Sequence, residues 1–259
     1  MSEDNKTYFI TGSDFEKLLN VLGKSGKVYI PGEALSREGT SNFPYTELGE
    51  NESYGFRGYR PADPLKTFLF SGRTTVAEYP SSGGDIPGIP SEPLTVVGAA
   101  SCDIESLKSL DAVFLQDEFT DIFYQDRRKS TFIISADCEH PRENCLCTLA
   151  GIYPYAKEGF DLNISSADNG YIIEVGSDKG AAVVAENAVF FAGVPTGLLD
   201  ERMKKRAGTT EKVKEINSEY RLSKNRSELL DAQRESDGWF DHVSTCIGCG
   251  ACLFSCPTC

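Results

Sequence analysis

Two apolar stretches in the middle of the chain have the pattern of buried strands. Residues 94–100 (LTVVGAA) are continuously apolar, and apolar positions at helical spacing follow over residues 104–114. Residues 130–136 (STFIISA) repeat the apolar, β-branched pattern. A strand, a helix and a second strand in this order predict a right-handed βαβ unit with parallel strands. The body of the protein is therefore expected to be an α/β domain.

The N-terminal residues predict a short helix. Ser13 and Glu16 have the spacing of a capping box, and the apolar residues around them recur at helical spacing. These apolar residues are Phe15, Leu18, Leu19 and Leu22. We expect this amphipathic helix to begin the fold.

Shorter strands and two connections are expected on either side. The candidate strands are residues 27–30, which end at Pro31, and residues 67–70, 160–166, 170–176 and 182–191. Residues 33–62 are polar and predict a long connection. Residues 79–93 contain SSGG and several prolines, which are typical of a loop.

The composition changes sharply at residue 200. Residues 200–237 are charged and poor in aromatics, with sparse apolar positions, so they are expected to form largely solvated helices that dock through one narrow stripe. The sparse apolar positions are Val213, Ile216, Leu229 and Leu230. We therefore divide the chain into three expected parts. They are an α/β body with a mixed, partly parallel sheet (1–199), a helical connector (200–240) and a partial ferredoxin-like 4Fe-4S module (241–259).

Charge and terminal sequence limit the function classes. A net charge of −13 argues against a nucleic-acid partner, because few basic side chains would neutralise phosphates. The N-terminus lacks the basic and apolar regions of a signal peptide, and no apolar run reaches the ~18 residues of a membrane span. A cytoplasmic protein without a membrane span is the expectation. The acidity is more simply explained by solubility than by a basic redox partner.

Nine cysteines in such a chain predict metal or redox chemistry. The cytosol keeps thiols reduced, so a disulfide framework is not expected. The cysteines fall into two groups, one in the middle of the chain and one at residues 246–259 (CIGCGACLFSCPTC). This grouping is typical of thiolate ligands.

The C-terminal group has the ligand spacing of a bacterial ferredoxin. Cys246, Cys249, Cys252 and Cys256 form the run C-x2-C-x2-C-x3-C-P, which binds [4Fe–4S] clusters. Glycines between the cysteines let the backbone approach the cluster. The fourth cysteine of such a run normally binds a second cluster, so a further cysteine run is expected after residue 259, with Cys259 as a substitute ligand. A zinc site is the less favoured alternative, because it usually needs two separated C-x2-C pairs.

The middle group predicts a second site. Cys102 and Cys138 follow the two strands expected to be parallel and adjacent, and ligands bind at the carboxyl ends of such strands. Cys145 and Cys147 lie in the next loop, so four thiolates are expected to converge on one crevice as a second iron–sulfur site. Structural packing and thiol redox chemistry remain alternatives. His140 is a candidate replacement ligand, and His242 has no assigned role.

Nucleotide and hydrolase signatures are missing from the sequence. The glycines form neither a P-loop nor a G-x-G-x-x-G motif after a strand. The presence of only two histidines argues against Ser/His/Asp chemistry.

Several segments together resemble a known family. They are residues 60–70 (RPADPLKTFLF), 101–115 (SCDIESLKSLDAVFL), 137–154 (DCEHPRENCLCTLAGIYP), 172–180 (IIEVGSDKG) and the C-terminal cysteine run. This set is similar to the iron–sulfur β-subunits of cytoplasmic sulfhydrogenases and to the related A-subunits of anaerobic sulfite reductase. Ser101 and Leu146 stand where proline and phenylalanine are common in that family. The family's members also continue beyond the CPTC element.

The resemblance implies an electron-transfer subunit. Such a subunit relays electrons between a flavin-containing subunit, linked to NAD(P)H or ferredoxin, and a catalytic subunit with nickel–iron or sirohaem. It also implies that the four cysteines of the ferredoxin run are cluster ligands. A stand-alone redox enzyme and a non-redox zinc module, each using the middle cysteines, are the alternative functions.

Overall fold

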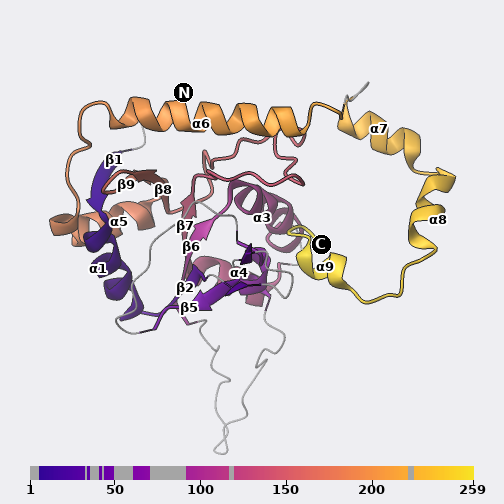
Figure 1. Cartoon of the computed structure of the whole chain (residues 1–259). Coiled ribbons are helices and arrows are strands. Elements are labelled where there is room, and N and C mark those ends of the chain that lie inside the picture. Colours follow the sequence, from indigo (N-terminus) through magenta and orange to yellow (C-terminus); the bar gives the residue numbers. More distant parts are fainter. Residues whose placement is uncertain are drawn as a thin grey trace, which may run out of the picture.

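The described part of the chain forms one mixed seven-stranded sheet with helices on both faces (Figure 1). The computed structural model describes residues 6–32, 34–35, 41–42, 44–49, 61–70, 92–116, 120–220 and 225–259. The strand order is β1-β9-β8-β7-β6-β2-β5. These strands are β1 (Thr7–Thr11), β2 (Lys27–Pro31), β5 (Tyr45–Glu47), β6 (Leu94–Ala99), β7 (Thr131–Ala136), β8 (Leu162–Ala167) and β9 (Gly170–Val175); β3 (Ala34–Leu35) and β4 (Ser41–Asn42) pair separately.

The centre of the sheet is parallel and its edges are antiparallel. Strands β2, β6, β7 and β8 pair in parallel, whereas β1, β9 and β5 join in antiparallel register. The predicted parallel pairing of β6 with β7 is therefore confirmed, as is the α/β class with a mixed, partly parallel sheet. The carboxyl ends of β6 and β7 meet at one edge.

Helices cover the two sheet faces in separate layers. One layer contains α1 (Gly12–Gly23) and α5 (Asp178–Glu186), and the other contains α2 (Lys66–Leu69), α3 (Ser101–Phe114) and α4 (Ile122–Ser130). The helices that follow in the chain are α6 (Leu198–Ile216), α7 (Arg226–Gln233), α8 (Asp237–Val243) and α9 (Ala251–Ser255), and a 3-10 turn lies at Ala188–Phe190. Successive residues of β7 point to opposite faces of the sheet. Ile134 packs with α1 and α5, while its neighbour Ile133 packs with α2, α3 and α4. Burial on both faces explains why β6 and β7 are continuously apolar.

The N-terminal prediction needs two corrections. A strand, β1, precedes α1, so the helix does not begin the fold. The N-cap is Thr11, whose Oγ1 accepts a hydrogen bond from the Asp14 N–H at 3.1 Å, and Ser13 lies inside the helix. Thr11 and Asp14 have the same spacing as the predicted pair Ser13 and Glu16. The predicted capping spacing was therefore right, but the predicted N-cap lies two residues after the observed one.

Two predicted strands are helices. Residues 67–70 lie mostly in α2. The turn begins where the Thr67 N–H donates to the Pro64 carbonyl, and it places the buried Leu65 and Leu69 one turn apart. Residues 182–191 belong to α5 and the 3-10 turn that follows it. The α5 helix begins where the Ser177 hydroxyl accepts a hydrogen bond from the Gly180 N–H. The other predicted strands, 27–30, 160–166 and 170–176, correspond to β2, β8 and β9 within two residues.

The predicted connections fall largely outside the described residues. The loop over 79–93 is described only from residue 92, and most of 33–62 is likewise outside. Strand β5 comes from that polar region and pairs with β2. Among the described residues, no helix has the length and apolarity needed to cross a membrane.

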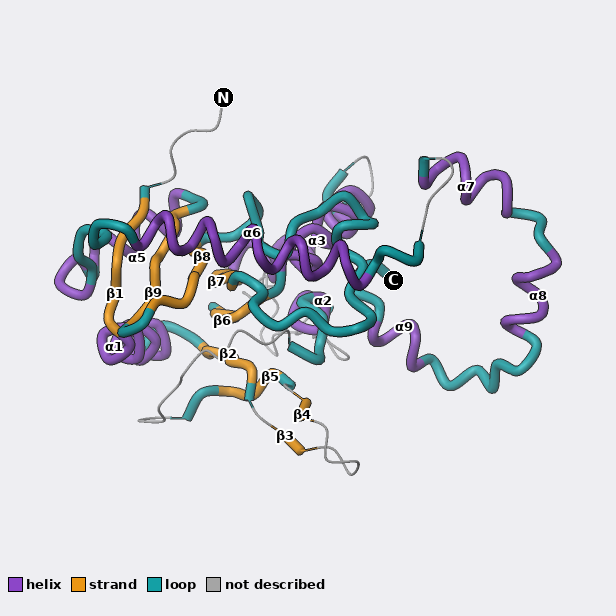
Figure 2. Tube along the Cα trace, turned by 45° about the horizontal axis from the view of Figure 1, so that its top comes forward, coloured by secondary structure: helices purple, strands orange, loops and turns teal. Residues whose placement is uncertain are grey.

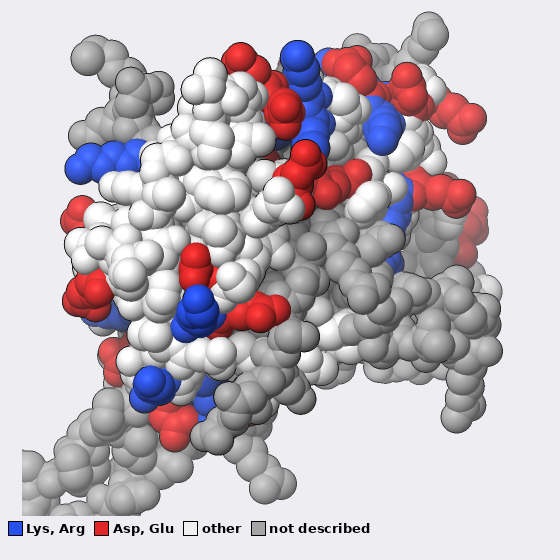
Figure 3. Space-filling model, turned by 60° about the vertical axis from the view of Figure 1, so that its left-hand side comes forward, with Lys and Arg blue, Asp and Glu red and all other residues white. Residues whose placement is uncertain are grey.

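The charged region forms helices as predicted. Helix α6 runs across the carboxyl ends of β7 and β8, and the chain then swings outward through α7 and α8 (Figures 1 and 2). It returns so that α9 contacts α2 through Lys66. Helix α6 buries Thr209 and Val213 and is otherwise largely solvated. Figure 3 shows acidic and basic side chains interspersed on the described part of one face.

Candidate functional site

All four middle cysteines line one cavity of about 210 Å³ at the carboxyl edge of the sheet. Cys102 opens α3 directly after β6, Cys138 follows β7, and Cys145 and Cys147 lie in the loop between β7 and β8. We call this space the thiol cavity. A single water needs only about 10–15 Å³ by the same measure, so the cavity has room for a group larger than one ion.

The remaining walls of the thiol cavity are mainly apolar. Ile152, Tyr153 and Pro154 come from the cysteine loop, and the buried Val213 closes the cavity from α6. Pro257 reaches the cavity from the C-terminal segment, which we define as residues 246–259. Apolar walls lower the polarity around the sulfur atoms, which are themselves partly exposed, and strengthen electrostatic interactions within the cavity.

Backbone hydrogen bonds fix the cysteine loop. The Arg142 N–H donates to Cys145 Sγ at 3.2 Å, and the Ile152 N–H donates to the Cys147 carbonyl at 2.9 Å. The Cys138 N–H donates to the Pro154 carbonyl at 2.8 Å, which joins the two ends of the loop. N–H donors directed at sulfur stabilise metal-bound thiolates and tune cluster potentials.

A buried ion network fixes α6 to the start of the same loop. The Arg206 guanidinium donates to both carboxylate oxygens of Asp137, at 2.7 and 2.9 Å, directly before Cys138. Arg206 also donates to Glu174 at 3.2 Å and lies over the Tyr155 ring, 4.4 Å from its centroid. Burial acts to lower the pKa of Arg206, but hydrogen bonds and charge from Asp137 and Glu174 outweigh it and raise the pKa.

Arg202 is the fourth member of this network, which contains the two arginines and the carboxylates of Asp137 and Glu174. Its guanidinium donates to Glu174 at 3.2 Å. Burial and the neighbouring Arg206 charge lower the pKa of Arg202, and the nearby carboxylates oppose that shift. Asp137 also accepts hydrogen bonds from Asn163 at 3.0 Å and Ser165 at 2.7 Å. The network therefore connects α6, β7, β8 and β9 beside the thiol cavity.

The first three cysteines of the ferredoxin run are exposed. Cys246 and Cys249 lie on the turn before α9 and Cys252 lies at the start of α9. In that turn Gly248 and Gly250 have φ of +70° and +73°, a conformation that favours glycine. The Gly248 N–H points at Cys246 Sγ at 3.4 Å. Residue types, glycine conformations and an N–H directed at sulfur are those of a cluster-binding loop.

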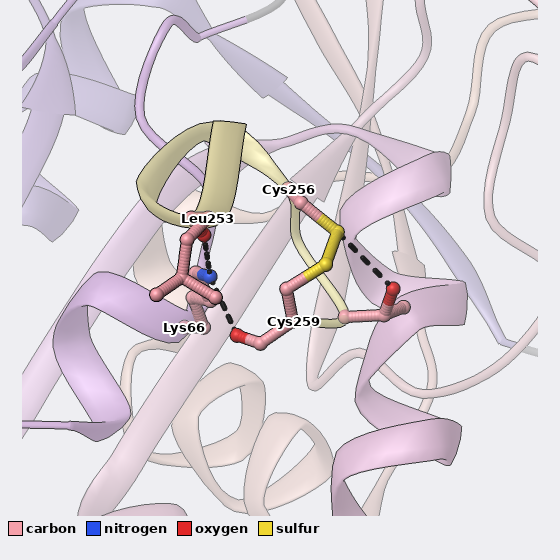
Figure 4. Close-up of a disulfide and its surroundings, with 5 residues drawn as sticks. Lys66, Leu253, Cys256 and Cys259 are labelled. Atoms are coloured by element: carbon pink, nitrogen blue, oxygen red, sulfur yellow. Dashed lines mark hydrogen bonds between the residues drawn. A yellow bond between two sulfur atoms is a disulfide. The ribbon is translucent and has the colours of Figure 1, made fainter. Parts of the chain in front are cut away.

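Cys256 differs from the other members of the run. It forms a disulfide with Cys259, with the Cα atoms 5.5 Å apart (Figure 4). Thr258 Oγ1 lies 3.4 Å from Cys256 Sγ. In this form Cys256 has no thiolate to offer a metal, so binding through it requires reduction of the disulfide.

The C-terminal group reaches the thiol cavity through Pro257, directly after Cys256, and neither cysteine group closes around a single metal ion among the described residues. Within the described ranges, three or more His, Cys, Asp or Glu side chains are not gathered at single-ion spacing. By donor chemistry, both groups suit a thiolate-bound iron–sulfur cluster. His140 is exposed on the cysteine loop and is not part of the cavity lining, and His242 is exposed in the last turn of α8.

Two positively charged side chains near these cysteines were not singled out from sequence. They are Arg206 and Lys66, whose ammonium group contacts the C-terminal segment. Lys66 lies in a segment that carried the family resemblance, and a lysine within the run PLKTFLF was the only local signal. Arg206 lies in a charged helix where many basic residues are solvated, so its burial had no local signal.

These features define a mixed α/β protein with one cysteine group in a cavity at the sheet edge and another in its C-terminal segment. No family model matches the chain. The chain is 30% identical over 249 residues to sulfhydrogenase 2 subunit beta of Pyrococcus furiosus, which is 95% of this chain and 70% of that protein. The chain belongs to the family of sulfhydrogenase beta subunits.

Proposed function

We propose that the chain is an iron–sulfur electron-transfer subunit of a hydrogenase-type complex. The observation that carries this proposal is the thiol cavity, where four cysteines from separate segments line one apolar space beside parallel strand ends. Family membership supports a subunit role, because the relative is by name a beta subunit. The partners we propose are a flavin-containing subunit and a catalytic subunit with nickel–iron or sirohaem.

The chain's own residues would hold two clusters. Cys246, Cys249, Cys252 and Cys256 are the proposed cluster ligands of the C-terminal site, with Cys256 acting after reduction of its disulfide. Because the fourth cysteine of such a run normally binds a second cluster, Cys259, released by the same reduction, is the proposed substitute ligand beside the first three. Residues Cys102, Cys138, Cys145 and Cys147 are the proposed ligands in the thiol cavity. A bound [4Fe–4S] cluster supplies one-electron redox chemistry.

The protein around each site has a separate role in this proposal. The apolar walls of the thiol cavity lower the polarity around the sulfur atoms, and the Arg142 N–H supports the Cys145 sulfur. The body (1–199) carries the cavity, and the connector (200–240) carries the ferredoxin-like module (241–259) back to it. Substrate chemistry would take place in a partner subunit.

Iron and sulfide counting on anaerobically prepared protein tests the proposal. Wild type is expected to contain about eight irons and eight sulfides, because each cluster has about four of each. The Cys102→Ala and Cys249→Ala variants are each expected to lose about four irons. Ser101→Ala, a buried neighbour of Cys102, is the matched control and is expected to keep all of them.

Three results would contradict parts of the proposal. Full iron content in Cys102→Ala would contradict the proposal that the thiol cavity holds a cluster. Full iron content in Cys249→Ala would contradict the proposal that the C-terminal cysteines hold a cluster. Zinc without sulfide in the wild-type protein would replace the electron-transfer function with a structural metal module.

A further inference from the structure

Lys66 connects the body to the C-terminal segment through a buried ammonium group. It lies on α2, and its side chain is largely buried. Its Nζ donates to the backbone oxygen of Leu253 at 2.5 Å and to that of Cys259 at 2.7 Å (Figure 4). One side chain therefore fixes both ends of residues 253–259, which are more than 180 residues away in sequence.

The position of Lys66 suits an ammonium group. Leu253 belongs to the short helix α9, whose last carbonyls have no partner within the helix and attract positive charge. Burying an ammonium group is costly unless its donors find acceptors, and here two carbonyl oxygens serve. The contact is therefore specific for a donor at this position.

The large apolar side chains of α9 remain mostly exposed in this docking. Leu253 and Phe254, the large apolar side chains of α9, are 53% and 73% exposed. Pro257 is half-buried and lines the thiol cavity together with Cys102 and Cys138. The Lys66 contacts thus lie on either side of the residue that touches the cavity.

We propose that Lys66 is a positioning residue for electron transfer within the chain. It fixes residues 253–259 against the body, so that the C-terminal cluster site lies next to the thiol cavity. Clusters held by the two cysteine groups would supply one-electron redox chemistry, and this docking would place the two sites side by side. This inference rests on the proposed function, because it needs a cluster at each site.

Amide hydrogen exchange tests the docking independently of iron. We compare anaerobic wild type with Lys66→Met, which keeps the side-chain length and removes the donor, and with Lys66→Arg, which restores a cation. Amides of residues 251–259 are expected to exchange about tenfold faster in Lys66→Met than in wild type, because two charged hydrogen bonds are lost. Lys66→Arg is expected to recover most of the protection. Amides of β7 report whether the fold is retained.

The matched control is Lys108→Met. Lys108 is an exposed lysine on α3 that pairs with Glu105 and Glu158. Its replacement is expected to leave exchange of residues 251–259 unchanged. If Lys66→Met loses β7 protection as well, Lys66→Leu, which also has no donor, replaces it with the same expectation. Equal exchange in wild type and in the folded Lys66 variant overturns the docking.

Electron paramagnetic resonance on fully reduced protein tests the consequence for electron transfer. Two reduced clusters close together broaden each other's signals. This broadening is expected in wild type and Lys66→Arg, and it is expected to be lost in Lys66→Met at unchanged iron content. Broadening retained in Lys66→Met overturns the positioning role. Iron-free protein in which exchange still depends on Lys66 would contradict the proposed function and the electron-transfer step, but would leave the docking contact intact.

Discussion

Asp137 shows how one buried carboxylate is made compatible with a cysteine site. It lies between β7 and Cys138, and it accepts hydrogen bonds from Arg206, Asn163 and Ser165. These donors compensate the cost of removing the carboxylate from water. The residue before the first cysteine of the loop is thereby fixed to two other elements, α6 and β8.

Replacing Arg206 is expected to destabilise the protein strongly. Arg206→Met leaves the buried Asp137 without its bidentate cation and Glu174 with Arg202 as its remaining cation in the network, and breaking a buried pair typically costs about 3–5 kcal/mol. The free energy of unfolding from urea titration measures the change. Lys214→Met on the same helix removes an exposed pair with Glu211 and is expected to change stability by less than about 0.5 kcal/mol. A loss below about 1 kcal/mol in Arg206→Met would show that the network contributes little.

At the element scale, helix α6 closes the thiol cavity with few buried side chains. Val213 is 1% exposed and lines the cavity, while most of the helix is solvated. Arg202 and Arg206 supply the polar contacts of the same helix. Helix α6 therefore depends on a short apolar contact and an ion network rather than on an extended hydrophobic face.

Shortening Val213 is expected to loosen this closure. Val213→Ala should lower the free energy of unfolding by roughly 1–3 kcal/mol, because two buried methyl groups are lost and the cavity grows. Thiol alkylation of the metal-free, reduced protein should become faster at the cavity cysteines. Val189→Ala, at an 86% exposed position, is the control and should change neither quantity. Unchanged alkylation rates in Val213→Ala would mean that α6 does not limit access.

The elements that could be predicted from sequence are those with a strong local pattern. β6 and β7 are buried on both faces, so their apolar runs are unambiguous. Residues 67–70 have equal apolar content but form one short helical turn, because tertiary packing of Leu65 and Leu69 decides their conformation. The strand predicted over residues 182–191 was wrong, because the valines and alanines of helix α5 also suit a strand.

At the scale of the whole molecule, the candidate site combines local and long-range information. Cysteine spacing and strand ends predicted which thiols belong together, because these signals lie within short segments. Lys66 and Arg206 could not be assigned, since their partners are contributed by segments far away in sequence. The disulfide of Cys256 with Cys259 was also not predicted, because the ferredoxin spacing assigns Cys256 to a cluster.

The two cysteine groups together define the central claim, that this chain takes up and passes on single electrons. The direct measurement is a redox titration of the anaerobically prepared protein, followed by its visible absorption. We predict a brown protein that dithionite bleaches, that takes up one electron per cluster, and that regains its colour on reoxidation. A colourless, iron-free protein that accepts no electrons from dithionite would contradict the account.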